Sequence, residues 1–118
     1  MHTALSGLTI VEIPSGVATR YCGRLFAAHG ANVLQLGEPA AGAIGFGGAG
    51  SDAYARWLDA GKRRIANLAD APTAALVIAG QTPSDVAAID AAMRDAGLSA
   101  TIRLGLTWFA DGGPYRNW

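Results

Sequence analysis

The chain has 118 residues, which limits it to one domain with a single modest hydrophobic core. Nine Lys and Arg residues balance nine Asp and Glu residues, so no broad basic surface is expected to hold a nucleic acid or an anionic membrane. With one cysteine, no Cys/His cluster at metal-ligand spacing and no apolar run near the roughly 20 residues of a membrane span, we expect a cytoplasmic protein without a metal.

The first third of the sequence predicts a strand, a helix and a second strand. Residues 8–13 form a nearly continuous apolar run, typical of a strand buried on both faces of a parallel sheet, and Pro14-Ser15-Gly16 ends it. Residues 17–29 predict a helix, and Gly30 follows where a left-handed residue commonly ends one. The apolar side of this helix is expected to carry Ala18, Cys22, Leu25, Phe26 and His29. Residues 32–36 then predict the second strand.

A glycine-rich segment and a short helix are expected next. Five glycines in residues 42–50 leave few side chains for a core, which predicts a loop. Residues 51–59 predict a helix that stops at Gly61, and residues 64–68 predict a third strand. The adjacent cations Lys62-Arg63-Arg64 are thereby placed at a turn, where they either hold phosphates or form a solvated basic surface.

The last third predicts two strands around a helix. Residues 75–79 and 101–106 are the strand candidates, and between them Thr82-Pro83-Ser84-Asp85 combines a helix cap, a proline at the first helical position and an acid in the first turn. The helix that follows is expected to end at Gly97. Its buried face is expected to carry Val86, Ile89, Met93 and Ala96.

Strands that alternate with helices over the whole length predict an α/β fold, in which helices flank a parallel, Rossmann-like sheet. The last predicted strand is followed by the turn-rich residues 112–118, without a helix to cover the sheet. We therefore expect residues 1–118 to form an incomplete lobe, from a truncated chain or a fragment.

The turn after the first strand is a candidate anion site. Residues 14–18 lead into a helix N-terminus, where free backbone N–H groups and the helix dipole favour a negative charge. Only Gly16 is present of the three glycines of a dinucleotide fingerprint, which disfavours an NAD or flavin site. An ordinary tight β-α turn explains the segment equally well.

Five short motifs follow one another along almost the whole chain. They are Leu5-Ser6-Gly7-Leu8-Thr9-Ile10-Val11-Glu12, Tyr21-Cys22-Gly23-Arg24-Leu25, His29-Gly30-Ala31-Asn32-Val33, Gly61-Lys62-Arg63 and Gly113-Pro114-Tyr115. In this order and at these separations they resemble the N-terminal part of the family III CoA-transferases. This CaiB/BaiF group includes formyl-CoA transferase, carnitine CoA-transferase and α-methylacyl-CoA racemase.

The resemblance implies a Rossmann-like lobe that binds coenzyme A as an acyl-CoA substrate, within an interlocked homodimer. The residues that it places near the CoA are Gly16, Val17, Ala18, Lys62, Arg63 and Tyr115. It also implies a catalytic carboxylate beyond the Pro114-Tyr115 segment, which carries the acyl group in the transferases, whereas a His/Asp pair moves the α-proton in the racemases. The chain ends before either constellation, so no catalytic residue is assigned, and both an acyl-CoA:carboxylate CoA-transferase and an acyl-CoA racemase stay open.

Three departures from the family pattern concern the CoA site. Glu38 stands at a usual arginine position, Asp59 at a usual asparagine position, and Ala79-Gly80-Gln81-Thr82 replaces the usual Asn-Phe-Arg-Pro-Gly segment. A negative charge near a diphosphate opposes its binding. The alternative to a CoA-binding lobe is therefore a degenerate, non-catalytic lobe that serves as a structural or dimerising half.

Overall fold

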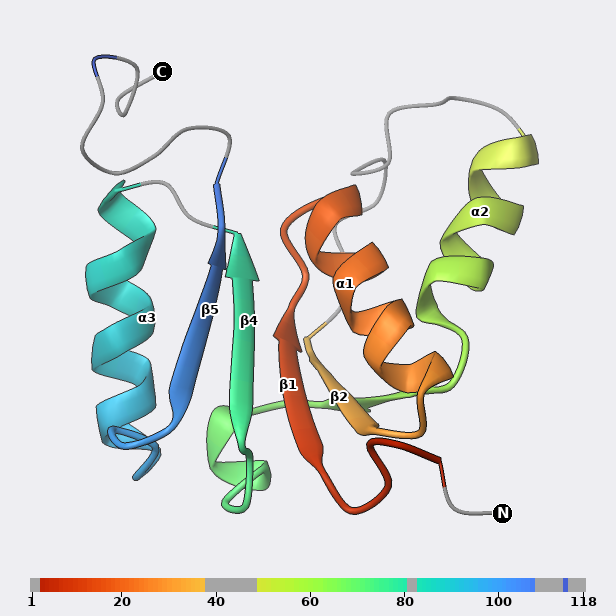
Figure 1. Ribbon diagram of the computed structural model, residues 1–118. Coiled ribbons are helices and arrows are strands. Elements are labelled where there is room, and N and C mark those ends of the chain that lie inside the picture. The colour runs from red at the N-terminus through yellow and green to blue at the C-terminus, as the bar shows by residue number, and fades with distance from the viewer. Residues whose placement is uncertain (1–2, 38–48, 81–82, 108–113, 115–118) are drawn as a thin grey trace.

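The computed structural model describes residues 3–37, 49–80, 83–107 and 114 (Figure 1). Five parallel strands form one sheet in the order β3-β2-β1-β4-β5. The strands are β1 (Thr9–Ile13), β2 (Asn32–Leu36), β3 (Lys62–Ile65), β4 (Leu76–Gly80) and β5 (Ile102–Leu106). The helices are α1 (Val17–Ala28), α2 (Ala49–Asp59) and α3 (Pro83–Asp95), with a 3₁₀ turn, η1, at Leu68–Asp70. The predicted α/β fold with a parallel, Rossmann-like sheet is confirmed.

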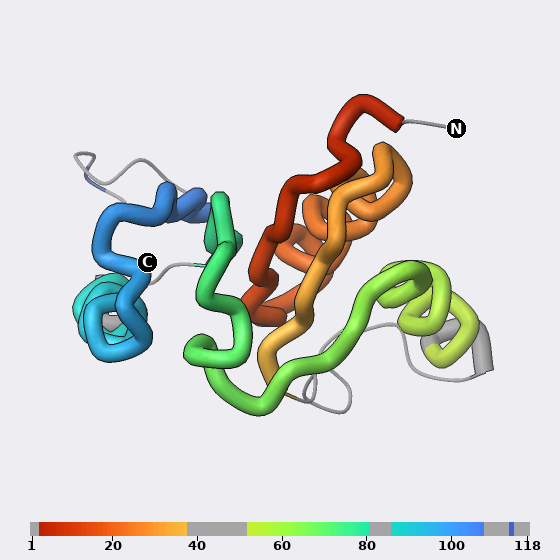
Figure 2. The backbone as a smooth tube through the Cα atoms, turned by 90° about the horizontal axis from the view of Figure 1, so that it is seen from below, coloured from red at the N-terminus to blue at the C-terminus, as the bar shows by residue number. Residues whose placement is uncertain are grey.

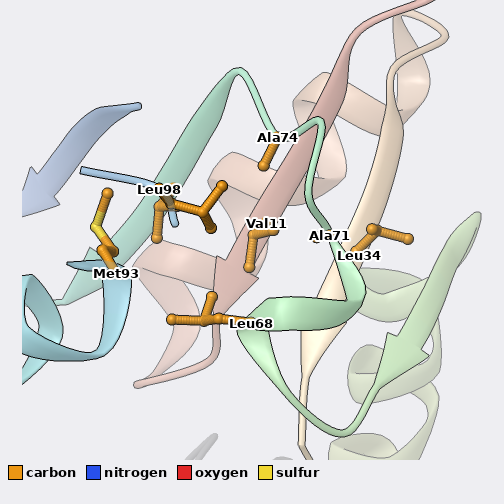
Figure 3. Packing of buried hydrophobic residues seen from close by; sticks show 8 residues of the cluster. Val11, Leu34, Leu68, Ala71, Ala74, Met93 and Leu98 are labelled. Atoms are coloured by element: carbon orange, nitrogen blue, oxygen red, sulfur yellow. The ribbon is translucent and has the colours of Figure 1, made fainter. Parts of the chain in front are cut away.

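Helices cover both faces of the sheet. Seen along the strands, α1 and α2 lie on one side, and α3 lies on the other (Figure 2). The core cluster on the α3 side, which η1 helps to cover, consists of Val11, Leu34, Leu68, Ala71, Ala74, Val77, Met93 and Leu98 (Figure 3). The smaller cluster on the α1 side consists of Ile10, Ala31, Val33 and Ile78, with Cys22, Phe26 and Ala27 packed against it. Because side chains alternate along a strand, the two clusters use alternate positions of the same strands.

Helix α1 turns a different face inward from the one that its apolar residues predict. Thr19, Arg20 and Gly23 are its buried residues, whereas Leu25 and His29 are exposed. The prediction for Leu25 and His29, and for the exposed Ala18, was therefore wrong, although Cys22 and Phe26 do pack partly against the sheet. The physical reason lies in the sheet, whose strands present polar side chains to this helix.

Two other predictions are corrected at the start of α2 and at β3. Helix α2 begins at Ala49, within the segment predicted as a loop, and the rest of that loop lies outside the described residues. Strand β3 begins at Lys62 and ends at Ile65, two to three residues before the predicted bounds. It pairs with β2 through Val33 and Lys62, so Lys62-Arg63-Arg64 lie in an edge strand instead of a turn.

The predicted helix ends are confirmed where the structure describes them. Gly30, Gly61 and Gly97 each have a positive φ, of 92°, 79° and 76°, which glycine adopts without the penalty that a Cβ brings. Met93 is buried on the α3 side, and Ile89 and Ala96 pack against the same cluster. The predicted cap at Thr82 lies outside the described residues. Among the described helices, none is long and apolar enough to cross a membrane.

Candidate functional site

The strand order changes direction next to β1, which has β2 on one side and β4 on the other. From β1 the chain passes through α1 to β2, and it later returns to the opposite side of β1 to form β4 and β5. In open α/β sheets, ligands bind beside the carboxyl ends of the strands at such a switch point. Here that point is formed by the turn at residues 14–16 and by Gly80 at the end of β4.

The turn between β1 and α1 is folded by its own hydrogen bonds. The Ser15 backbone N–H donates to Thr19 Oγ1 at 3.0 Å, and the Thr19 hydroxyl donates to the Gly16 carbonyl oxygen at 3.2 Å. Gly16 has a φ of 142°, which side-chain-bearing residues rarely adopt, and a Cβ built on it meets no atom of the described residues within 4 Å. The hydrogen bonds of Ser15 and Thr19 therefore fix the backbone before α1, and no described residue fills the space beside Gly16.

The N-terminus of α1 has no side-chain cap. Gly16 occupies the cap position without a side-chain hydrogen bond, and the first turn contains no acidic residue. The first helical bond runs from the Arg20 N–H to the Gly16 carbonyl oxygen at 3.4 Å, so the N–H groups of Val17 and Ala18 precede the bonded ladder. With the positive end of the helix dipole, these groups can donate hydrogen bonds to a phosphate or a carboxylate.

Strand β4 ends against the same turn. A Cβ built on Gly80 would overlap the Ser15 hydroxyl oxygen and would stand 3.5 Å from Thr19 Cγ2. Only glycine fits at this position, because the Ser15 side chain occupies the space that another side chain needs. In the sequence, Gly80 stands out only as part of a departure from the family pattern, and the sequence does not predict its contact with Ser15.

The structure does not bring Lys62 and Arg63 to this turn. Lys62 has a side chain that is 1% exposed, and its ammonium donates to Glu12 Oε1 at 2.8 Å, to Glu12 Oε2 at 3.0 Å and to the Arg20 carbonyl oxygen at 2.8 Å. Arg63 is exposed and pairs in register with Leu34, which belongs to the α3 side of the sheet. Tyr115 and Glu38 lie outside the described residues.

A buried polar network joins five elements beneath α1. Arg20 donates to Asp59 Oδ1 from Nε at 3.0 Å and to Asp59 Oδ2 from Nη2 at 2.6 Å. Gln35 donates from Nε2 to Asp59 Oδ1 at 2.9 Å and to Glu12 Oε2 at 3.0 Å. Together with Lys62, these residues connect β1, α1, β2, α2 and β3. Two carboxylates face two cations, so the charges of the buried network balance.

Sequence reasoning missed this network, although a signal was present. Glu12 and Gln35 are polar residues with apolar neighbours on both sides in their strands, and buried polar groups need partners. The network also explains why an aspartate stands at position 59, where the family pattern has an asparagine, since both of its carboxylate oxygens accept hydrogen bonds from Arg20. Asp59 therefore clamps the end of α2 to α1, rather than facing a ligand at the switch point.

Burial and pairing shift the pKa values of the network in different directions. Burial raises the pKa of Glu12, and the hydrogen bond and charge of Lys62 oppose this rise. Burial lowers the pKa of Lys62, against the opposite effect of Glu12. At Asp59, burial alone would raise the pKa, but the hydrogen bonds from Arg20 and Gln35 and the charges of Arg20 and Lys62 outweigh it and lower the pKa. Burial and the Glu12 charge raise the pKa of Cys22, which disfavours a reactive thiolate there.

The lowered pKa of Asp59 predicts an acid-dependent contribution to stability. Because the folded-state pKa lies below the ordinary value of 3.8, the stabilisation is complete above that value and is lost as the pH falls through the folded-state pKa. The stability difference between the protein and an Asp59→Asn variant should therefore shrink below pH 3.8. Urea unfolding of both proteins from neutral pH down to about pH 2 measures it.

Comparison with the variant isolates Asp59 from Glu12, whose effect has the opposite sign. The raised pKa of Glu12 stabilises the fold below 4.5 and loses this contribution as the pH rises through the folded-state value. A stability difference between protein and variant that stayed constant across the acid range would mean that Asp59 is not paired as the structure shows.

The described residues contain no group of three or more His, Cys, Asp or Glu residues arranged to hold a metal ion. We take the switch point as the candidate site because the helix N-terminus there has no side-chain cap, and the buried network supports the helix that forms it.

Comparison with known proteins identifies the fold. No protein-family model matches the sequence, and no curated protein is similar enough in sequence to match. Among solved structures, a CaiB/BaiF family protein from Brucella suis matches with a TM-score of 0.72 and 22% identity, over 99% of this chain and 36% of that one. The Mycobacterium tuberculosis protein Rv3272 matches with a TM-score of 0.67 and 18% identity, over 98% of this chain and 36% of that one.

The chain therefore spans little more than a third of the length of these solved structures. At this level of identity the likeness is one of fold, and it agrees with the family that the sequence motifs resemble. Over 99% of its length, the chain shares its fold with about a third of a CaiB/BaiF family protein.

Proposed function

We propose that the chain is the N-terminal CoA-binding lobe segment of an acyl-CoA:carboxylate CoA-transferase. The observation that carries the proposal is the uncapped N-terminus of α1 at the switch point of the sheet. Its support comes from two further sources, the order of the five sequence motifs and the fold that the chain shares with a CaiB/BaiF family protein.

In this proposal, the backbone around residues 16–18 binds a phosphate of CoA. The N–H groups of Val17 and Ala18 donate to the phosphate oxygens, and Gly16 leaves the approach open because it carries no side chain. Charge-assisted hydrogen bonds of this kind are shorter and stronger than neutral ones. Thr19 keeps the turn in place through its hydrogen bonds with Ser15 and Gly16.

The two cations of the Gly61-Lys62-Arg63 motif contribute differently. Lys62 is a positioning residue in this proposal, because its ammonium holds β1 and α1 together and its bonds are satisfied inside the protein. Arg63 lies on the other side of the sheet, so the phosphate site does not depend on it. Contact between Tyr115 and CoA remains a prediction from the resemblance.

The lobe binds and orients CoA, and it does not supply the group that forms or breaks the thioester bond. Transfer to a carboxylic acid requires a nucleophilic carboxylate, and racemisation requires an acid/base pair at the α-carbon. The described residues that form the switch point, Pro14, Ser15, Gly16 and Gly80, carry neither a carboxylate nor an imidazole side chain. A racemase of the same family therefore remains the alternative activity of a full-length protein.

A structural or dimerising lobe is the second candidate function. It is favoured by the exposed apolar residues on the outer side of α1, which a purely nucleotide-binding segment does not need. The two functions differ in a measurable way, since only the first requires saturable binding of CoA.

The test of CoA binding uses two substitutions at the first helical position. Val17→Pro removes one backbone donor while preserving the helix start, because proline fits that position, and Val17→Ala keeps the donor. We expect Val17→Pro to weaken CoA binding by about 1.5–3 kcal/mol, the usual value of a hydrogen bond to a charged group, and Val17→Ala to leave it nearly unchanged. Isothermal titration calorimetry at fixed salt measures all three proteins.

Inorganic pyrophosphate serves as a second ligand, which separates phosphate binding from recognition of the whole coenzyme. Equal weakening by the proline and alanine variants would show that the backbone donor is not used. If the unaltered chain bound no CoA at millimolar concentration, the structural or dimerising function would replace the CoA-binding one.

A further inference from the structure

Aromatic side chains of α1 and α2 form one cluster. The ring centroid of Trp57 lies 6.0 Å from that of Tyr21, with an angle of 31° between the rings, and 5.9 Å from that of Tyr54, with an angle of 9°. Trp57 and Tyr21 keep 45% and 44% of their surface exposed, so the cluster is not part of the core. Figure 1 shows α1 and α2 side by side, which brings these rings together. We call Tyr21 and Trp57 the aromatic platform.

A cation borders the aromatic platform. The guanidinium carbon of Arg24 lies 5.4 Å from the centre of the Trp57 ring. Within the residues that the structure describes, no acid forms an ion pair with Arg24, and no acceptor takes the N–H of its buried Nε. Arg20, one turn earlier in the same helix, is by contrast held by Asp59. Arg24 therefore has a positive charge that no described acid neutralises.

The two features together match a ligand that has both a flat ring system and a phosphate. Exposed aromatic side chains bind nucleic-acid bases by stacking, because every base has a π-face. A guanidinium binds phosphate oxygens through charge-assisted hydrogen bonds. Two rings whose centroids are 6.0 Å apart offer a wider stacking surface than one ring, which favours a bicyclic purine over a single-ring pyrimidine.

We propose that the aromatic platform and Arg24 bind a purine mononucleotide. The base stacks on the exposed surface of Tyr21 and Trp57, and the phosphate pairs with the guanidinium of Arg24. This site goes beyond the proposed CoA site and does not rest on it. Tyr21 follows Val17 by four residues, so the platform begins about 6 Å further along the axis of α1 and lies on the side of the helix instead of at its N-terminal end.

Calorimetric titration with adenosine monophosphate (AMP) tests the proposal. The unaltered chain should bind AMP saturably, and Trp57→Leu should raise the dissociation constant by about tenfold, as the loss of a stacked ring does. Arg24→Gln should weaken AMP binding by a similar factor and leave adenosine binding unchanged, because adenosine has no phosphate. Arg56→Gln is the matched control, since Arg56 is an exposed cation of the same helix as Trp57 and has no contact with the platform among those described.

Tryptophan fluorescence locates the base. AMP should quench part of the emission of the unaltered chain, and this quenching should be missing from Trp57→Leu, while circular dichroism confirms that the variant is folded. If Trp57→Leu does not fold, Tyr21→Leu replaces it, because Tyr21 is exposed on α1 and its loss should weaken AMP binding through the same stacking surface.

Val17→Pro separates the platform from the switch point. The variant lacks a backbone donor at the N-terminus of α1, so AMP binding should stay unchanged if the nucleotide lies on the platform. Four results would overturn the proposal. They are the absence of saturable AMP binding at millimolar concentration, inorganic phosphate that binds as tightly as AMP, equal effects of Arg24→Gln and Arg56→Gln, and AMP binding that Val17→Pro weakens but Trp57→Leu does not.

Discussion

Lys62→Met should lower the free energy of unfolding by about 3–5 kcal/mol, because it leaves the buried Glu12 carboxylate without its cation. The side chain of Glu12 is fully buried, and Lys62 supplies its shortest contact, at 2.8 Å. Methionine fills much of the lysine volume, so the expected loss reflects the unpaired charge and not an empty cavity. Urea unfolding at neutral pH measures the loss.

Arg64→Met is the matched control for this substitution. Arg64 belongs to the same strand and the same face of the sheet, but its side chain is 44% exposed and lies 3.9 Å from Asp59. Arg64→Met should therefore lower the free energy of unfolding by less than about 1 kcal/mol. A double variant, Glu12→Leu with Lys62→Met, should recover most of the stability, because it removes both charges together. Equal effects of Lys62→Met and Arg64→Met would contradict the buried pairing.

Gly23→Ala should also destabilise the fold, by about 1–3 kcal/mol, although alanine favours a helix by about 1 kcal/mol over glycine. A Cβ at this position would stand 2.7 Å from Glu12 Oε1 and 3.2 Å from Lys62 Nζ. Neither atom can move away without breaking the buried pair, so the added methyl group strains the contact between α1 and β1.

Thermal or urea unfolding of the alanine variant decides between the two effects. A lower midpoint with an unchanged slope would show that the close approach outweighs helix propensity. A stabilised variant would show that the space between α1 and the Glu12–Lys62 pair is larger than the structure shows.

Much of the fold could be predicted because its signals are local. Residues 8–13 and 32–36 are apolar runs bounded by turn residues, and they form β1 and β2. The glycines at positions 30, 61 and 97 end their helices as expected, since the need for a positive φ is a property of a single residue. Because the predicted strands alternate with helices along the chain, a parallel sheet could then be predicted.

The placement of β3 and the face of α1 could not be predicted in the same way. Residues 62–64 are all cations, so they show no alternation of apolar and polar residues. They form a strand in which Lys62 pairs with the buried Glu12 of β1, fifty positions earlier in the chain. A second pair, Arg20 with Asp59, accounts for the side of α1 that is buried, since Arg20 points inward to Asp59. Such contacts between distant residues leave no periodic pattern in a single sequence.

Part of the candidate site could be predicted from the sequence. The turn at residues 14–18 follows a predicted strand and leads into a predicted helix N-terminus, and the structure adds that this N-terminus has no side-chain cap. The assignment of Lys62 to the CoA phosphates came from the resemblance, and only the structure shows that Glu12 and the Arg20 carbonyl oxygen take up its ammonium. Gly80 contacts Ser15 of the turn because β1 and β4 are neighbours in the sheet, and the strand order is known only from the structure.

An amide NMR titration of the isotopically labelled chain with CoA tests most directly the proposed binding of CoA at the switch point. Addition of CoA should produce saturable shifts at the amides of Gly16, Val17 and Ala18, with a smaller change at Gly80 on the neighbouring strand. The amide of Arg63, on the edge strand, should change little. Saturable shifts centred on Arg63, or no saturable shift at the N-terminus of α1, would contradict the account.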